Sequence, residues 1–498
     1  MPARNLFIGF DGSNPDLIDH MIEEGELPNF KRVRDASKIY PIENDPGMGA
    51  GQFWSSASIG ADPSYHGRYF YIQFNPYTYD IAPNHETKLP DTTPFWNELD
   101  AEGFKIAVID WHRMNPKPLK NGILVDNWIG HDPLTPPKFF PPSLAETAAQ
   151  YFTQDAISGG FESRKRETVE DLQEYLDCAF NRIRTKSKFC TEQIKSGDWD
   201  LFVACFSDTH DVGHQFQFLE DRDHELYNAE TARHLGNPLR QTYREQDQAI
   251  ERIINGAGPD ARIFMFGGPG METLISANSA LEEMLRRIDL GVGAPVSAAE
   301  AARNSYRSFF PLSLRRRIAP LARAIRRNVA NSEYQRRRFF SVPHNDNAGA
   351  IRINVKGREK FGTVEKGAQY DEVIEEVTSA LATFRNLATG RPIVKEVIPV
   401  QKLFDGPYCD ILPDLFVVWD RTDTKRDFRK IASDQFGEID VKPAIRNGDH
   451  NPYGFFWMPS EGGDQIIKRP GDIANAVTNM VRSPGKVEYK SSSISHHV

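Results

Sequence analysis

The sequence has few cysteines, no long apolar run and no excess of positive charge. Its four cysteines form no CxxC pair, which argues against a disulfide framework or a cysteine zinc site. No segment approaches the ~20 apolar residues that a membrane span requires. The formal net charge of −9 gives no reason to expect nucleic-acid binding. We therefore expect a globular protein with no membrane span and no nucleic-acid partner.

The start of the chain and the cysteines both point to the cytoplasm. Residues 1–5 lead directly into an apolar run at 6–10, which leaves no room for a signal peptide. The cysteines are expected to be reduced and partly buried. The length of 498 residues allows one large domain with insertions, or two to three smaller domains.

Short apolar runs alternate with helical patterns along most of the chain. An amphipathic helix is predicted at 169–194 and another at 238–254. Strands are predicted at 6–10, 105–109, 201–206, 262–266, 351–355, 415–419 and 455–458. This alternation predicts an α/β fold with a mostly parallel central sheet and helices on both faces.

Residues 274–340 differ from the rest in composition. Alanine, glutamate and leucine come first, and arginines cluster between 303 and 338. We predict an inserted helical subdomain or lid, whose arginines form either a solvated surface or a site for an anionic partner. Residues 1–273 and 341–485 then form the main domain, and 486–498 a disordered tail.

An acid follows the first strand at the point where a helix begins. Asp11 comes directly after the run at 6–10, and Pro15 suits the first turn of the next helix. The carboxyl ends of strands are where open α/β sheets bind ligands. Asp11 is therefore a candidate site residue, with a helix N-cap as the alternative.

Three histidines follow or precede predicted strands. His210 and His214 are four residues apart after the strand at 201–206, so on a helix they share one face and can bind one metal ion. Asp208 could orient these imidazoles. His450 precedes the strand at 455–458, on a loop at an edge of the same sheet. The alternative for His450 is an incidental residue of a surface turn.

Two further segments contribute candidate residues. Gly49, Ala50 and Gly51 precede a probable helix, where backbone amides can approach an anion, and the alternative is a structural tight turn. His344 and Asp346 precede a predicted strand and could face the same crevice, with a polar turn as the alternative.

Several motifs occur in the order seen in a known family. The chain resembles the type I phosphodiesterase/nucleotide pyrophosphatase branch of the alkaline phosphatase superfamily from about residue 5 to about residue 480. The segment 274–340 is the least typical. The resemblance rests on residues 10–18, 27–30, 54–67, 354–367, 406–415 and 450–454.

The resemblance implies a fold with two metal ions, of which the first lacks most of its ligands here. In that family the first metal is held by an aspartate after the first strand, a Thr or Ser nucleophile and an Asp-His pair. Asp11 matches the aspartate, but the nucleophile falls on Ala50 and the pair on Gly268 and Pro269. Alanine cannot form a covalent phospho-enzyme.

The same resemblance implies that the second metal site is retained. His214 and His450 match family ligands, and the family's aspartate falls on His210. Three imidazoles suit zinc, which is the divalent ion that we expect, although iron, copper, nickel and cobalt also bind such sites.

Other assignments near these positions stay open. Ser55 and Ser56 are nearby hydroxyls, and a short gap in the alignment with the family would bring Ser55 to the position of the nucleophile. Glu272 or Asp208 could rebuild the first metal site.

These assignments lead to three functional hypotheses. The first is a single-metal hydrolase of a small-molecule or glycan phosphate or sulfate ester, with Asp11 as base or orienting group and residues 49–51 as the anion site. The second is a non-catalytic protein that binds a phosphorylated or sulfated ligand or a partner. The third is a transferase or biosynthetic enzyme that uses the same pocket. The sequence favours the first, and it determines neither the substrate nor the oligomeric state.

Overall fold

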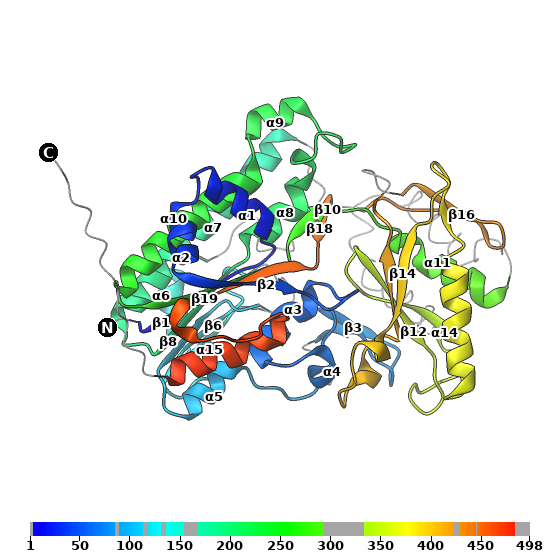
Figure 1. Cartoon of the computed structure of the whole chain (residues 1–498), viewed down its shortest axis with the longest axis horizontal. Helices are drawn as coiled ribbons and strands as arrows, with labels where there is room; N and C mark the ends of the chain where they lie inside the picture. The colour runs from blue at the N-terminus through cyan, green and yellow to red at the C-terminus, as the bar shows by residue number, and fades with distance from the viewer. Residues whose placement is uncertain are drawn as a thin grey trace.

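The computed structural model describes residues 3–84, 89–112, 117–130, 136–153, 168–291, 333–422, 428–444 and 446–483. Within these residues the protein has a larger lobe around an eight-stranded sheet and a smaller lobe around a four-stranded sheet (Figure 1). The predicted tail at 486–498 and most of the arginine-rich segment lie outside the described residues.

The large sheet has a parallel centre and antiparallel edges. Strands β9, β1, β8, β5 and β6 run parallel, whereas β19, β2 and β7 pair antiparallel with their neighbours. The predicted mostly parallel α/β sheet is therefore confirmed. The strand order is β2 (Ser37–Glu43), β19 (Tyr453–Pro459), β9 (Arg262–Gly267), β1 (Asn5–Phe10), β8 (Leu201–Phe206), β5 (Ile106–Ile109), β6 (Gly122–Asp126) and β7 (Lys138–Phe140).

Helices cover both faces of this sheet because its central strands are apolar on both sides. In β1, Leu6 and Ile8 lie in one apolar core and Phe7 in the core on the opposite face. The first core is covered by α1 (Pro15–Glu23), α2 (Pro28–Asp35), α7 (Val169–Ser196) and α10 (Pro238–Ala257). The second is covered by α3 (Ala50–Ile59), α5 (Phe95–Ala101) and α15 (Ile473–Arg482) (Figure 1).

The larger lobe also contains several short elements. These are α4 (Pro63–His66), β3 (Ile72–Phe74), β4 (Ile81–Pro83), α6 (Leu144–Ala149), α8 (Asp208–Phe216), α9 (Ala229–Leu235), β10 (Met271–Thr273) and β18 (Gly448–His450). Among them, α8, β10 and β18 build the candidate site. No helix in the described parts of the chain combines the length and apolarity needed to cross a membrane.

The smaller lobe has its own sheet and its own apolar core. The antiparallel order is β11 (Phe339–Val342), β12 (Ala348–Ile353), β15 (Leu415–Trp419) and β14 (Val394–Pro399). Helices α11 (Asn278–Leu290) and α14 (Ala368–Leu381) pack on it. Beside it lie β13 (Arg385–Asn386), β16 (Lys430–Ser433) and β17 (Gly437–Asp440). The strands predicted at 351–355 and 415–419 thus join this separate sheet, and the domain boundaries at 273 and 341 stay a prediction.

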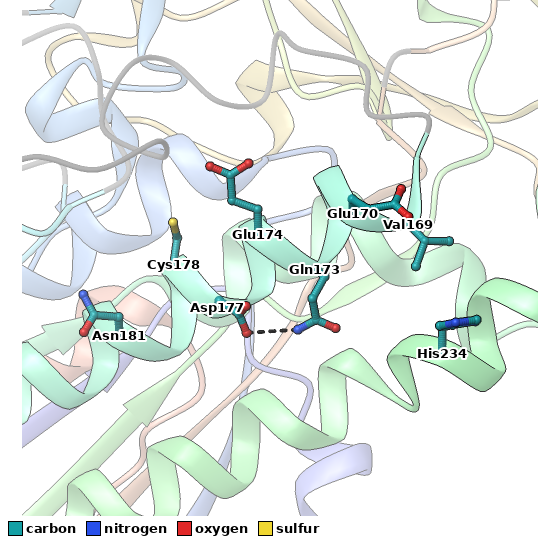
Figure 2. A pocket seen from close by; sticks show the side chains of 8 residues that line it. All are labelled: Val169, Glu170, Gln173, Glu174, Asp177, Cys178, Asn181 and His234. Atoms are coloured by element: carbon teal, nitrogen blue, oxygen red, sulfur yellow. Dashed lines mark hydrogen bonds between the residues drawn. The ribbon is translucent and has the colours of Figure 1, made fainter.

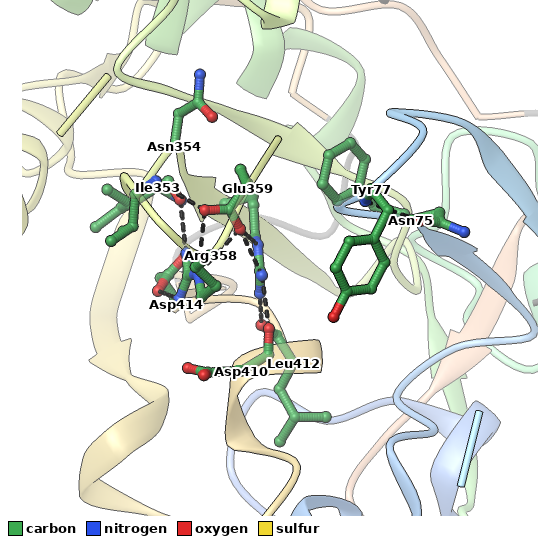
Figure 3. A network of polar contacts seen from close by, with 12 residues as sticks. Asn75, Tyr77, Ile353, Asn354, Arg358, Glu359, Asp410, Leu412 and Asp414 are labelled. Carbon is green, nitrogen blue, oxygen red and sulfur yellow. Dashed lines mark hydrogen bonds and ion pairs between the residues drawn. The ribbon is translucent and has the colours of Figure 1, made fainter. Parts of the chain in front are cut away.

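Two of the family-like motifs form a buried charge network in the smaller lobe (Figure 3). Arg358 donates from Nη1 and Nη2 to the two carboxylate oxygens of Asp414, at 2.7 and 2.8 Å. Arg352 donates from Nε to Glu359 at 2.7 Å. Burial alone would raise the pKa of Asp414, but Arg358 outweighs it and holds this pKa below its usual value. These motif residues stabilise the lobe and lie outside the candidate site.

The two lobes share a small apolar cluster, which brings a loop of the smaller lobe to the site. Met48 and Tyr69 of the larger lobe pack with Phe340 and Phe416 of the smaller one. The loop at 343–347, between β11 and β12, therefore lies next to the N-terminus of α3.

Candidate metal centre

Three histidines from two distant segments form a buried cluster in the larger lobe. Helix α8 places His210 and His214 on one face, with ring centroids 4.4 Å apart. His450 ends β18, and its ring centroid lies 4.8 Å from that of His210 and 5.2 Å from that of His214. One nitrogen from each ring lies within 4.8 Å of the other two. The structure thus brings together the three predicted ligands.

Close backbone approaches at glycines make this arrangement possible. A Cβ on Gly448 would lie 2.3 Å from the carbonyl oxygen of Gly213, so β18 can pack against α8 only with glycine at this position. Gly12 has a φ of +69°, and its Cβ would lie 2.5 Å from the Cα of His210. These contacts hold α8 between the end of β1 and the strand that carries His450.

Backbone carbonyls orient two of the three rings. The Nδ1 atom of His214 donates to Gly448 at 2.6 Å, and that of His450 donates to Pro269 at 3.0 Å. Since a carbonyl only accepts, each Nδ1 carries a hydrogen, and Nε2 is the atom of each ring that can bind a metal ion. Pro269 occupies a position where the resemblance implies a metal ligand, and here its carbonyl orients a histidine instead.

The Nε2 atom of His450 meets the chemical requirement for a metal ligand. It is buried with no hydrogen-bond partner among the described residues. Burial, followed by the neighbouring His210, lowers the pKa of His450 to about 4. The ring is therefore neutral near pH 7, which is the form that binds metals. Three imidazoles are a donor set that zinc accepts, so the residues fit the expected ion.

Asp11 lies against His210 in the manner of a carboxylate that orients a metal-binding histidine. Its Oδ2 is 3.3 Å from Nδ1 of His210, and its Oδ1 accepts a 2.8 Å hydrogen bond from the indole of Trp54. At this ion-pair distance a carboxylate can orient the ring and leave Nε2 for a ligand. This geometry favours the orienting role among those expected for Asp11.

A fourth histidine, which the sequence analysis missed, flanks Asp11. Nε2 of His112 lies 3.7 Å from Oδ2 of Asp11, and its ring meets that of Trp54 edge-on at 5.2 Å. His112 follows β5 as Asp11 follows β1, so its position after a strand was the available signal. The acid next to it, Asp110, is instead paired with Lys186 at 3.1 Å.

The predicted anion-binding residues lie at the N-terminus of α3. Gly49 is the N-cap, and the helix, which is ten residues long, begins at Ala50 without a side-chain cap. A Cβ on Gly49 would lie 2.0 Å from Oδ1 of Asn345, so the loop from the smaller lobe requires glycine there. A Cβ on Gly51 would lie 2.6 Å from the backbone of Phe70.

Asp346 reaches the cluster through an arginine that the sequence analysis also missed. Arg446 donates from Nη2 to Asp346 at 3.1 Å, and its Nη1 lies 3.2 Å from Nε2 of His214. Arg446 precedes His450 by four residues, on the segment leading into β18, which was the signal in the sequence.

Other sequence candidates are engaged elsewhere. Asp208 is buried 3.8 Å from Nε of Arg182. His344 packs its ring against those of Tyr69, Phe70 and Phe416. Glu272 forms an ion pair with Arg421. None of these three joins a group of metal-ligating side chains in the described part of the chain.

The hydroxyl of Ser56 belongs to a directed hydrogen-bond chain. The backbone amide of Arg68 donates to Nδ1 of His66 at 3.1 Å, so Nε2 carries the hydrogen and donates to Ser56 at 3.0 Å. Ser56 then donates to Gln52 at 2.8 Å. His66 therefore cannot accept the proton of Ser56 as a base. Ser55, the other hydroxyl considered, is completely buried in α3.

A separate cavity lies on the outer side of α7 (Figure 2). It has a volume of about 660 Å³ and includes Glu170, Glu174 and Asp177 among its lining residues. No lining residue belongs to the histidine cluster, and three carboxylates disfavour an anionic ligand there.

A comparison with one solved structure supports the fold. The structure is similar to phosphonoacetate hydrolase from Sinorhizobium meliloti 1021 in complex with phosphonoacetate, with 13% identity, a TM-score of 0.53 and 96% of each chain covered. It is also similar to human ectonucleotide pyrophosphatase/phosphodiesterase 5, with 11% identity and a TM-score of 0.47, over 98% of this chain and 96% of that one.

A comparison of sequences identifies the family. No curated protein matches the chain. The family model for type I phosphodiesterase/nucleotide pyrophosphatase matches residues 5–422, which is most of the sequence. The chain therefore belongs to the type I phosphodiesterase/nucleotide pyrophosphatase family.

Proposed function

We propose that this protein is a hydrolase of small phosphate esters that uses one divalent metal ion, zinc in the first instance, held by His210, His214 and His450. The observation that carries the proposal is the buried cluster whose rings are oriented from behind by Gly448, Pro269 and Asp11. Family membership supports a phosphoester substrate. The proposal extends to sulfate esters and to esters of glycans as substrates. It also places the protein in the cytoplasm.

The residues of the site have separate roles in the proposed reaction. A divalent ion supplies Lewis acidity and a water that ionises near neutral pH. Asp11 keeps the His210 ring in place through Nδ1. The first amides of α3, at Ala50 and Gly51, bind the negatively charged oxygens of the ester.

The residue at the nucleophile position shapes the reaction. Ala50 has no hydroxyl, so water would attack phosphorus directly: a new P–O bond forms, the bond to the leaving alkoxide breaks, a proton of the water passes to that alkoxide, and no phospho-enzyme forms. Gly268 and Pro269 offer no side-chain ligand for a second ion. Phosphonoacetate hydrolase, whose fold the chain shares, was solved with the small anion phosphonoacetate, and we extend a small anionic substrate to the present chain.

A second candidate function rests on the same three positions. Alanine, glycine and proline at 50, 268 and 269 remove the nucleophile and two ligands that the resemblance implies. A protein that binds a phosphorylated ligand without turnover would retain the histidine cluster and the α3 amides. A transferase that uses the same pocket is the third candidate.

The test compares hydrolysis by the zinc-loaded wild-type protein with that by H214A. We expect the wild-type protein to release p-nitrophenol from p-nitrophenyl phosphate, from the corresponding diester or from p-nitrophenyl sulfate. The rate of release should be about 10²–10³-fold lower in H214A. H234A, which changes an exposed histidine, serves as the matched control. Zinc-loaded protein that hydrolyses none of the three esters would contradict the hydrolase proposal and favour the binding protein.

A further inference from the structure

Arg446 occupies a position beside the histidine cluster that the function proposed above does not use. Its Nη1 lies 3.2 Å from Nε2 of His214, and its Nη2 is 3.1 Å from Oδ2 of Asp346. Its side chain is 20% exposed. The guanidinium is therefore held between the larger lobe and the loop of the smaller lobe, at the edge of the cluster.

This contact and a metal ion compete for one lone pair. His214 donates from Nδ1 to Gly448, and a guanidinium can only donate, so Nε2 of His214 meets Nη1 of Arg446 with its single lone pair. In this structure that lone pair accepts from Arg446. A metal ion that uses Nε2 of His214 therefore requires Arg446 to give up this hydrogen bond, while its bond to Asp346 can persist.

The charges around the cluster indicate which groups would surround the guanidinium of Arg446 once a metal ion has displaced it from His214. Asp11, Asp346 and Asp449 all contact the cluster or its arginine, and Asp449 accepts the backbone amide of His450 at 2.8 Å. Three carboxylates repel an anionic substrate unless cations offset them. Arg446 is the described cation in direct contact with a cluster histidine, and its planar fork matches the oxygens of a phosphoryl group.

We propose that Arg446 is the specificity-determining residue of this site: it covers His214 in the metal-free protein and binds the tetrahedral oxyanion of the substrate in the metal-loaded protein, positioned by Asp346. The inference rests on the metal site of the proposed function. It adds the residue that recognises this substrate class, because a guanidinium held in this way selects a phosphoryl or similar oxyanion over a neutral ester.

The test measures two affinities in R446Q and in the wild-type protein. Zinc binding to metal-free protein is measured by competition with a chromophoric chelator, and inorganic phosphate binding to zinc-loaded protein by calorimetry. We expect R446Q to bind zinc about tenfold more tightly, because the competing donor is gone, and phosphate at least ~10-fold more weakly. R446K should restore part of the phosphate affinity, since lysine keeps the charge without the fork.

R421Q is the matched control, because Arg421, which follows β15 of the smaller lobe, is paired with Glu272 of β10 and does not contact a cluster histidine in the described structure. It should change neither affinity. Unchanged or weaker zinc binding by R446Q, or unchanged phosphate binding, overturns the assignment of Arg446 while leaving the metal site intact. Failure of both wild type and R446Q to bind zinc overturns the metal site and the inference together.

Discussion

The buried network of Arg352, Arg358, Glu359 and Asp414 and the histidine cluster are both built from family-like motifs, but they differ in how their polar atoms are satisfied. In the network, each carboxylate meets a guanidinium. Asp414 also accepts from the hydroxyl of Tyr370 and from the amide of Ile353 (Figure 3). In the cluster, Nε2 of His450 is buried without a hydrogen-bond partner in the described structure.

This difference separates structural from chemical roles. A closed network of buried charges gains nothing from a ligand, and breaking it costs stability. A buried lone pair without a donor is costly unless a ligand uses it. The comparison therefore favours a folding role for the network and supports the binding role that we propose for the cluster, although both come from motifs of one family.

Breaking the network gives the largest expected effect. D414N removes the negative charge that pairs with Arg358, and the free energy of unfolding should fall by about 3–5 kcal/mol. Chemical denaturation measures this loss, and metal analysis of the folded fraction should show unchanged zinc content. A D414N protein of wild-type stability that fails to bind zinc would reverse the two roles.

Acid should affect the two regions in different pH ranges. His450 has a pKa of about 4 when folded against 6.5 when unfolded. The unfolded state therefore gains a proton first as the pH falls, and the metal-free protein loses about 3 kcal/mol of stability between pH 6.5 and 4.

Asp414 also stabilises the folded protein less as the pH falls, but it does so in a lower pH range than His450. Its folded pKa lies below the ordinary 3.8, so its contribution to stability is complete above pH 3.8 and is lost only as the pH falls further. Denaturation of metal-free wild-type protein and H450N as a function of pH tests this order. Equal slopes for the two proteins between pH 6.5 and 4 would contradict it.

A smaller effect is expected from the residue that orients His210. D11N keeps the size of the side chain but removes its charge, and zinc affinity should fall by about 10–100-fold while the stoichiometry is retained. Competition with a chelator measures the affinity, and D16N, which changes an exposed aspartate of α1, is the control. Complete loss of zinc binding in D11N would instead make Asp11 a direct ligand.

Local patterns in the sequence predicted most of the fold and the pairing of two of the three clustered histidines. Alternating apolar runs predicted the strands, and the four-residue spacing of His210 and His214 predicted that they share a helix face. His450 could be joined to them only through the family resemblance, because it lies more than 200 residues away in the sequence.

The rest depends on contacts that no local pattern encodes. Asp11 and Asp110 both follow strands, yet Lys186 of α7 pairs with Asp110 while His210 lies against Asp11. His112 and Arg446 were missed because neither has a ligand-like spacing. The strands at 351–355 and 415–419 look like those of the large sheet, but periodicity does not determine which sheet a strand joins.

The most direct test of the metal site is the metal content of the purified protein, measured by inductively coupled plasma mass spectrometry for wild type, H210A/H214A and the control H20A/H234A, whose histidines are exposed. Each protein is first incubated with zinc and then dialysed. The account predicts about one equivalent of zinc in wild type and in the control, and none in H210A/H214A. Absence of bound metal from wild-type protein, or equal zinc in all three proteins, would contradict it.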